Sequence, residues 1–205
     1  MKERDVFVLG INGSPHKVGR GAKLLRQSLR QADREGARTE LVHLIDWPLP
    51  IYPGYSINRF PKRSKALFQN VRQADALILS TPTRWYSRSA LIGNFIEWLT
   101  VFDLPPYNYA LLGKVAGFIA TCEEDSGQQA INDIAAPLVH MGFMIPPWTM
   151  VFHNINMAEE SEGGWQLKDH LLTASNVVKL ARLTVEFRTK GSQYWHYGGM
   201  ARSRP

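Results

Sequence analysis

The chain has 205 residues, a length that suits one domain with a core large enough to fold without disulfide or metal cross-links. Its 44% hydrophobic and 20% charged residues are globular values, which exclude a disordered, collagen-like or coiled-coil chain. The single cysteine, Cys122, excludes a disulfide framework and a thiolate zinc site, and the net charge of +6 predicts either an affinity for polyanions or a local site for a small anion.

No segment has the features of a targeting or membrane-spanning element. The first apolar run, residues 6–11, is too short for the core of a signal peptide. No stretch reaches the ~18 consecutive apolar residues of a transmembrane helix. We therefore expect a soluble, cytoplasmic protein with no membrane partner, and the single cysteine fits a reducing compartment.

The hydrophobic pattern alternates between short apolar runs and amphipathic segments, which predicts strands alternating with helices. Thr81 and Pro82 are expected to end the third strand, and residues 1–190 are expected to form a single domain followed by a tail at 191–205. The expected strands span residues 5–11, 38–44, 75–80, 114–121 and 143–152, and the expected helices span residues 21–36, 64–74, 89–101, 128–141 and 169–187.

Five strands and five helices in alternation predict an α/β fold, a doubly wound open parallel sheet with helices on both faces. In such sheets ligands bind beyond the carboxyl ends of the strands. The loops that follow the strands are therefore the candidate functional site.

The loop after the first strand, Asn12 to Gly21, has the composition of a phosphate site. Ser14 supplies a hydroxyl, and His16, Lys17 and Arg20 supply donors or positive charge at the start of a helix, where free backbone amides favour anions. An ordinary polar turn remains the alternative. A Walker A loop is excluded because no Gly-Lys-Ser/Thr occurs, and the third glycine of a dinucleotide fingerprint is replaced by Leu24.

Two further loops stand out at the same edge of the predicted sheet. The loop after the third strand carries Trp85 and Tyr86, which either form one wall of a pocket for a flat ring or simply cap the sheet. The loop after the fourth strand, Thr121 to Gly127, is polar and acidic. Three neighbouring loops would thus offer one surface suited to phosphate, one aromatic surface and one polar surface.

Together these loops resemble the NADPH-dependent FMN reductase family of flavodoxin-like proteins. Gly13 to Gly21 resembles the family's phosphate loop, Gly-Ser-Pro-Arg-Lys-x-Gly-Asn-(Thr/Ser), and Thr81 to Ser87 resembles its flavin loop, (Thr/Ser)-Pro-x-Tyr-Trp-(Gly/Tyr)-Ser. Leu91 to Trp98 resembles the helix that continues from the flavin loop, and Leu112 to Lys114 matches the approach to the fourth strand. The similarity spans roughly residues 5–155, in the family's order.

The resemblance implies a sheet of strand order 2-1-3-4-5, bound FMN, and hydride transfer from NADPH or NADH through FMN to a flavin, quinone or similar small acceptor. FMN would carry the chemistry, so no side chain is given a catalytic role, and the spacing of the histidines predicts no metal site. Family members are commonly homodimers or homotetramers. The residues expected to bind FMN are Ser14, His16, Lys17, Arg20, Gly21, Ala22, Pro82, Thr83, Arg84, Trp85, Tyr86, Thr121, Glu124 and Gly127.

The sequence departs from the family pattern in all three loops. His16 stands where the family has Arg, and Arg20–Gly21 replaces Asn-Thr, so we expect the charge of Arg20 to compensate for a lost hydroxyl donor. Arg84 stands where the family has Tyr. Glu123–Glu124–Asp125 replaces glycines, and we expect these carboxylates to point away from the ring while backbone amides face it.

Other residues have simpler interpretations. Cys122 is expected to be a small buried hydrophobe rather than a reactive thiol. The acidic residues of the third loop favour a solvated surface over a Mg²⁺ site. The aromatic tail residues Tyr194 to Tyr197 are expected to pack on the domain or on a neighbouring subunit, unless the tail is a disordered end.

The same sequence leaves two alternative functions to consider. A flavodoxin-like electron carrier without its own NAD(P)H-dependent turnover is the main alternative, although such carriers are typically acidic and this chain is not. A nucleic-acid-binding module would interleave aromatics with a basic stripe on a groove-fitting element. The aromatics here follow strand ends instead, so no nucleic-acid partner is expected.

The positive charge is concentrated near the first loop. Between Lys17 and Arg38 seven basic residues oppose two acidic ones. Lys17 and Arg20 have a candidate anion in the FMN phosphate. The basic residues farther along the helix, Arg26, Arg30 and Arg34, are interpreted as a solvated face.

Overall fold

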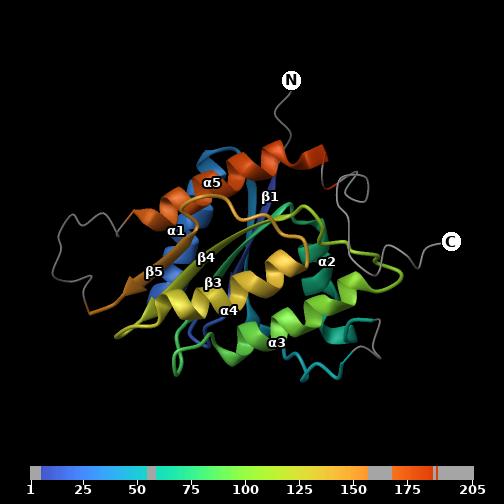
Figure 1. Cartoon of the computed structure of the whole chain (residues 1–205), viewed down its shortest axis with the longest axis horizontal. Helices are drawn as coiled ribbons and strands as arrows, with labels where there is room; N and C mark the ends of the chain where they lie inside the picture. Colours follow the sequence, from blue (N-terminus) through green and yellow to red (C-terminus); the bar gives the residue numbers. More distant parts are fainter. Residues whose placement is uncertain (1–5, 55–58, 157–167, 187, 189–205) are drawn as a thin grey trace.

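The computed structural model describes residues 6–54, 59–156, 168–186 and 188. Its centre is a parallel sheet of order β2-β1-β3-β4-β5, as the resemblance implied (Figure 1). The strands are β1 (Phe7–Asn12), β2 (Arg38–His43), β3 (Ala76–Pro82), β4 (Val115–Cys122) and β5 (Met150–Asn154). The helices are α1 (Arg20–Arg34), α2 (Lys65–Gln73), α3 (Ala90–Leu99), α4 (Gly127–His140) and α5 (Asp169–Leu183), with 3₁₀ turns at Leu44–Asp46, Lys62–Ser64 and Thr100–Asp103.

Two apolar layers cover the sheet. One packs α1 and α5 against residues such as Val8 and Ile78, and the other packs α2, α3 and α4 against residues such as Leu9 and Leu77. Figure 1 shows α1 and α5 on one side of the sheet and α3 and α4 on the other. Because both faces are covered, β1, β3 and β4 are almost wholly buried and consist mainly of apolar residues. The fold class predicted from the hydrophobic pattern is confirmed.

Two predicted strand boundaries are wrong. The third strand does not stop before Thr81 and Pro82, because both residues belong to β3 and pair in register with Ala120 and Thr121 of β4. The predicted strand at 143–152 is also too long: β5 begins at Met150. Pro146 and Pro147 carry no backbone N–H for a ladder, so their segment loops out before the chain joins β4.

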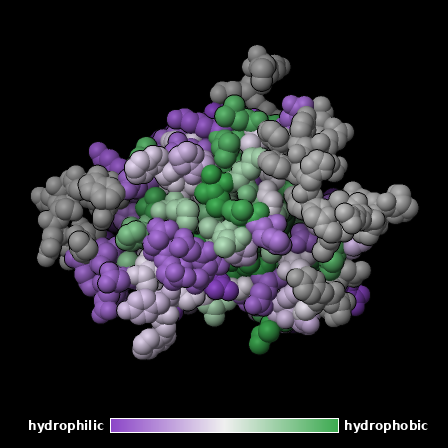
Figure 2. All heavy atoms as spheres, in the orientation of Figure 1, coloured by the Kyte–Doolittle hydropathy of each residue, from purple (hydrophilic) through white to green (hydrophobic). Residues whose placement is uncertain are grey.

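The outer edge at β5 carries exposed apolar side chains. Val139, Trp148, Phe152 and Leu172 are at least two-fifths exposed. Figure 2 shows apolar surface between α4 and α5 on this side of the molecule. None of the helices in the described part of the chain combines the length and the apolar character needed to cross a bilayer. The expected helix end at Phe187 and the tail at 191–205 lie outside the described residues.

Candidate functional site

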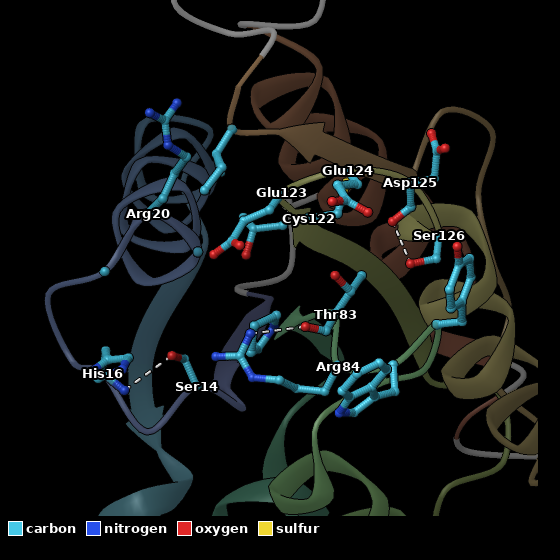
Figure 3. A pocket seen from close by; sticks show the side chains of 17 residues that line it. Ser14, His16, Arg20, Thr83, Arg84, Cys122, Glu123, Glu124, Asp125 and Ser126 are labelled. Atoms are coloured by element: carbon cyan, nitrogen blue, oxygen red, sulfur yellow. Dashed lines mark hydrogen bonds between the residues drawn. The ribbon is translucent and has the colours of Figure 1, made fainter.

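The loops after β1, β3 and β4 enclose a cavity of about 540 Å³ at the carboxyl edge of the sheet (Figure 3). The structure brings eleven of the predicted residues together in its wall: Ser14, His16, Arg20, Gly21, Pro82, Thr83, Arg84, Trp85, Tyr86, Thr121 and Glu124. Sequence reasoning missed six others that line it: Gly19, Cys122, Glu123, Asp125, Ser126 and Ile155.

Asn12, the last residue of β1, organises the first loop. Its side-chain oxygen accepts from the Ser14 amide at 3.2 Å, and its amide group lies 3.4 Å from the carbonyls of Ser14 and His16. The same amide group lies 2.8 Å from Nδ1 of His43 on the neighbouring β2. Burial lowers the pKa of His43, which favours the neutral ring that can accept this hydrogen bond. Asn12 was not predicted, although its place just before Gly-Ser is a signal for a side chain that folds the turn.

The start of α1 faces this loop without a side-chain cap. Its N-cap residue is Gly19, which has no side chain to bond the amides of the first turn. A Cβ on Gly21 would lie only 2.8 Å from Oγ of Ser80, so glycine lets the first turn approach β3 closely. The Ser14 hydroxyl accepts from the His16 amide at 3.1 Å. Uncapped amides and the Ser14 hydroxyl thus lie at one end of the cavity, and Arg20 is among the residues that line it.

Three predicted ligands lie outside the cavity wall. Lys17 Nζ forms an ion pair at 2.5 Å with Asp46, which lies in the 3₁₀ turn after β2, so its charge is directed away from the cavity. Ala22 lies in the first turn of α1 and is fully buried. Gly127 is buried against β5, where a Cβ would lie 2.5 Å from Cβ of Phe152. The expected contacts of Lys17, of the Ala22 backbone amide and of Gly127 with FMN stay predictions.

The aromatic loop is a two-residue turn with unusual backbone angles. Arg84 and Ser87 exchange both backbone hydrogen bonds, at 2.8 and 3.0 Å, and the two residues between them have positive φ, 47° for Trp85 and 63° for Tyr86. Such turns favour Asn-Gly, and large side chains are strained there. The side chains of Trp85 and Tyr86 are 97% and 68% exposed, so the alternative that they cap the sheet is wrong.

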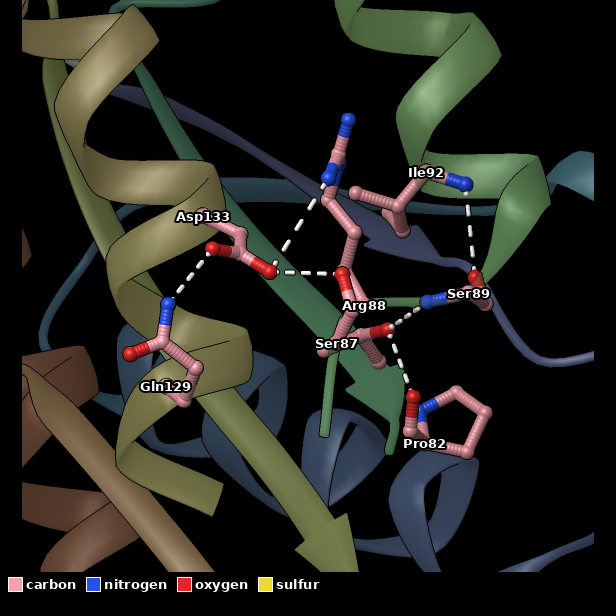
Figure 4. Close-up of polar contacts among 8 residues, drawn as sticks. Pro82, Ser87, Arg88, Ser89, Ile92, Gln129 and Asp133 are labelled. Carbon is pink, nitrogen blue, oxygen red and sulfur yellow. Dashed lines mark hydrogen bonds and ion pairs between the residues drawn. The ribbon is translucent and has the colours of Figure 1, made fainter. Parts of the chain in front are cut away.

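Polar contacts fix the end of this turn and the start of α3 that follows it (Figure 4). The Ser87 hydroxyl donates to Asp133 of α4 at 2.6 Å, and Gln129 donates to the other carboxylate oxygen at 2.9 Å. The Ser89 hydroxyl, at the N-cap of α3, donates to the Gly13 carbonyl at 2.7 Å and so ties the aromatic turn to the phosphate-like loop. These contacts join segments distant in sequence, and no local motif predicts them.

The third loop brings negative charge to the cavity. Glu123, Glu124 and Asp125 all line it. Figure 3 shows the Glu123 side chain reaching toward the cavity, so the expectation that these carboxylates point away does not hold for Glu123. Asn156 donates to the Glu123 carbonyl at 2.5 Å, and Asn154 donates to the Glu124 carbonyl. Two backbone carbonyls are therefore held toward β5 instead of the cavity.

Cys122 is 2% exposed, and its thiol lies 3.6 Å from the His153 carbonyl. Burial raises the pKa of this thiol, which disfavours the reactive thiolate. The prediction of a buried, hydrophobe-like cysteine agrees with this environment. Within the residues that the structure describes, no group of three or more His, Cys, Asp or Glu could hold a metal ion.

Comparisons with known proteins agree on the fold and the flavin chemistry. Residues 6–156 match the NADPH-dependent FMN reductase family. A NAD(P)H-dependent FMN reductase of Pseudomonas aeruginosa is 29% identical over 120 residues, which cover 57% of this chain and 64% of that protein, slightly less than two thirds of its length.

Two solved structures share the fold. RosB, solved with bound 8-demethyl-8-formylriboflavin-5′-phosphate, has a TM-score of 0.74 at 18% identity, covering 94% of this chain and 88% of its own. The NAD(P)H:acceptor oxidoreductase FerB of Paracoccus denitrificans has a TM-score of 0.67 at 21% identity, covering 87% of this chain and 98% of its own.

Proposed function

The chain belongs to the NADPH-dependent FMN reductase family, and from that premise we propose that it is an oxidoreductase that binds FMN in the cavity described above. FMN and NAD(P)H are the cofactor and the co-substrate of this family. The observation that carries the proposal is the composition of the two ends of the cavity. The cavity extends from the uncapped start of α1 to the exposed Trp85–Tyr86 turn, and so offers an anion site and an aromatic wall in one space.

The residues present fit FMN at both ends. The phosphate would lie at the first turn of α1, near its uncapped amides and the Ser14 hydroxyl, in a wall that also includes His16 and Arg20. The flat ring would lie between the segment Pro82–Tyr86 and the loop 121–126. A volume of about 540 Å³ is within the usual range for a cofactor pocket.

FMN supplies the redox chemistry when bound, accepting a hydride from NAD(P)H and passing electrons on. The protein binds the phosphate, orients the ring and leaves one side open. The Glu123 carboxylate, which reaches toward the cavity, would make additional negative charge on a ring bound there less favourable. Trp85 at the open side offers a surface on which a flat acceptor can stack, so we propose a flavin, a quinone or a similar aromatic compound as acceptor.

The rival proposal is an electron carrier without NAD(P)H-dependent turnover. The net charge of +6 speaks against it, because a basic protein lacks the acidic surface typical of such carriers. Assembly as a homodimer or homotetramer and a cytoplasmic location stay predictions.

The first test is the absorbance spectrum of the purified protein. We expect flavin bands, release of FMN on denaturation, and NADPH oxidation when a quinone or free flavin is supplied. A colourless protein that does not take up added FMN would refute the proposal. A yellow protein that oxidises neither NADPH nor NADH would support the carrier instead.

A matched pair of variants tests the location of FMN. Arg20→Gln removes a cation that lines the cavity, and we expect FMN to bind about tenfold more weakly, since a charge-assisted bond to phosphate is lost. Lys17→Gln removes the same charge from a residue paired with Asp46, and we expect an effect below about threefold. Equal losses from both variants would contradict the phosphate position.

A further inference from the structure

The two edges of the sheet differ in character. At one edge, β2 is a charged strand, in which Arg38 and Glu40 form an ion pair at 2.9 Å. At the other edge, β5 reads Met-Val-Phe-His-Asn and contains no Asp, Glu, Lys, Arg or Pro. Charged side chains and prolines are the usual means by which an edge strand is kept from pairing with another chain. Because β5 lacks them, its outer edge is suited to a further strand.

The hydrogen bonds of β5 show which backbone groups face this edge. The Thr149 carbonyl accepts from the Phe118 amide at 2.7 Å, and the Ile155 amide donates to the Cys122 carbonyl at 2.8 Å. Backbone groups alternate in direction along a strand, so the odd-numbered residues here bond β4 and the even-numbered residues point outward. The amide and the carbonyl of Phe152, the middle residue of β5, therefore face the outer edge. Among the described strands none lies beyond β5 to pair with them.

Exposed apolar side chains flank the outer edge on both sides. Figure 1 shows β5 between α5 and α4. Phe152 and, on α4, Val139 are 42% and 53% exposed, while Leu172 on α5 is 49% exposed. Trp148 is 73% exposed at a positive φ of 58°, and its carbonyl accepts from the Thr173 hydroxyl of α5 at 3.3 Å. Single exposed apolar residues are common, but four around one strand edge (Figure 2) indicate a protein partner.

The outer edge of β5 is complementary to itself. A two-fold axis through Phe152 places this residue opposite its own copy, and the outward-facing groups of one strand then meet those of the other. We propose that β5 pairs in antiparallel orientation with β5 of a second copy of this chain, so that the two sheets join into one and the apolar side chains of α4 and α5 pack around the pair. Such an interface uses the same patch on both subunits, as two-fold dimers do. The pairing requires neither FMN nor NAD(P)H, so it is independent of the proposed function.

The first test measures the mass of the full chain by analytical ultracentrifugation. We expect a dimer at micromolar concentration. Phe152→Lys places like charges opposite each other across the axis, and the dissociation constant of the dimer should rise at least about tenfold. Ile51→Lys is the matched control, because Ile51 is 85% exposed and lies in a loop that is bonded to Asn94 of α3, away from β5. It should leave the dimer intact.

The second test gives a positive signal and does not depend on tolerance of a charge. Opposite residues of an antiparallel hydrogen-bonded pair have Cα atoms about 5.5 Å apart, within the range of a disulfide. The native Cys122 is 2% exposed, so oxidised glutathione should link Phe152→Cys into a covalent dimer and leave Ile51→Cys mostly unlinked.

Three outcomes would overturn the proposal. One is a wild-type protein that stays monomeric throughout the micromolar range. Another is a dimer that Phe152→Lys leaves intact or that Ile51→Lys breaks, since the interface would then lie elsewhere. The third is equal cross-linking of the two cysteine variants. If Phe152→Lys does not fold, as judged by its circular dichroism, the cysteine variants decide alone.

Discussion

At the scale of single residues, Gly13 is the position in the loop after β1 where a side chain has no room. Its amide donates to the Ser80 carbonyl at 2.8 Å, and a Cβ would lie 2.0 Å from Cγ1 of Ile92 on α3. Gly13→Ala must therefore push the loop away from β3 or displace α3. We expect a loss of about 1–3 kcal/mol in the free energy of unfolding, measured by urea titration, together with weaker FMN binding.

Gly19→Ala in the same loop is the matched control. The nearest atom to a Cβ there is Cβ of His16 at 3.4 Å, and φ is −67°, which any residue adopts. We expect less than about 1 kcal/mol of change in stability, which would arise from the N-cap position alone. Losses of equal size in the two variants would show that steric contact with Ile92 is not the cause.

The positions of residues that are set by their own loop could be predicted from the sequence. The positions of residues that are set by a partner distant in the sequence could not. Ser14 and Arg20 follow a strand and begin a helix, and that local context is sufficient to place them in the cavity. Lys17 has the same local context, but its position is decided by Asp46, which another loop supplies. The contact of Asp133 with Ser87 likewise exists only after α4 packs beside the turn.

At the scale of elements, the turn from Arg84 to Ser87 stores strain next to the site. Two large residues occupy positive-φ positions that suit Asn and Gly, and their exposed side chains gain little from packing. The double substitution Trp85→Asn with Tyr86→Gly should therefore raise the free energy of unfolding by about 1–2 kcal/mol. It should also raise KM for aromatic acceptors, because the exposed rings at the cavity mouth are lost.

Urea titration and acceptor kinetics measure these two effects on the same preparation. Ser87→Ala is the control, since it breaks the bond to Asp133 and leaves the strained residues unchanged. It should lower stability by about 1 kcal/mol. A double variant less stable than the wild type would show that Trp85 and Tyr86 make stabilising contacts instead of storing strain.

The helices and strands themselves were largely predictable, because a parallel sheet covered on both faces leaves long apolar runs in the sequence. The failed boundary at the end of β3 depends on the neighbouring strand. β3 continues through Pro82 because β4 offers Thr121 as its partner, and the backbone amide of Thr83 then donates to the Thr121 carbonyl at 2.9 Å. A single segment carries no information on how far its neighbour extends.

At the scale of the whole molecule, buried histidines make stability depend on pH. Burial lowers the pKa of His170 to about 4 from an ordinary value of 6.5, and His153 beside it lowers it further in the same direction. The unfolded chain therefore binds more protons than the folded protein between about pH 6.5 and 4, and stability falls as the pH falls through that window. For a ring this deeply buried the loss amounts to roughly 2–3 kcal/mol.

The variant His170→Phe keeps an aromatic ring at this site without the titrating nitrogens. Urea midpoints measured from pH 7 to 4 should fall less steeply for it than for the wild type, with the two curves converging or crossing toward pH 4. Asp103 acts in the opposite direction, since burial raises its pKa to about 6 and its contribution to stability grows as the pH falls. Because both proteins contain Asp103, its effect cancels in the comparison. Parallel curves for the two proteins would assign the acid sensitivity to groups other than His170.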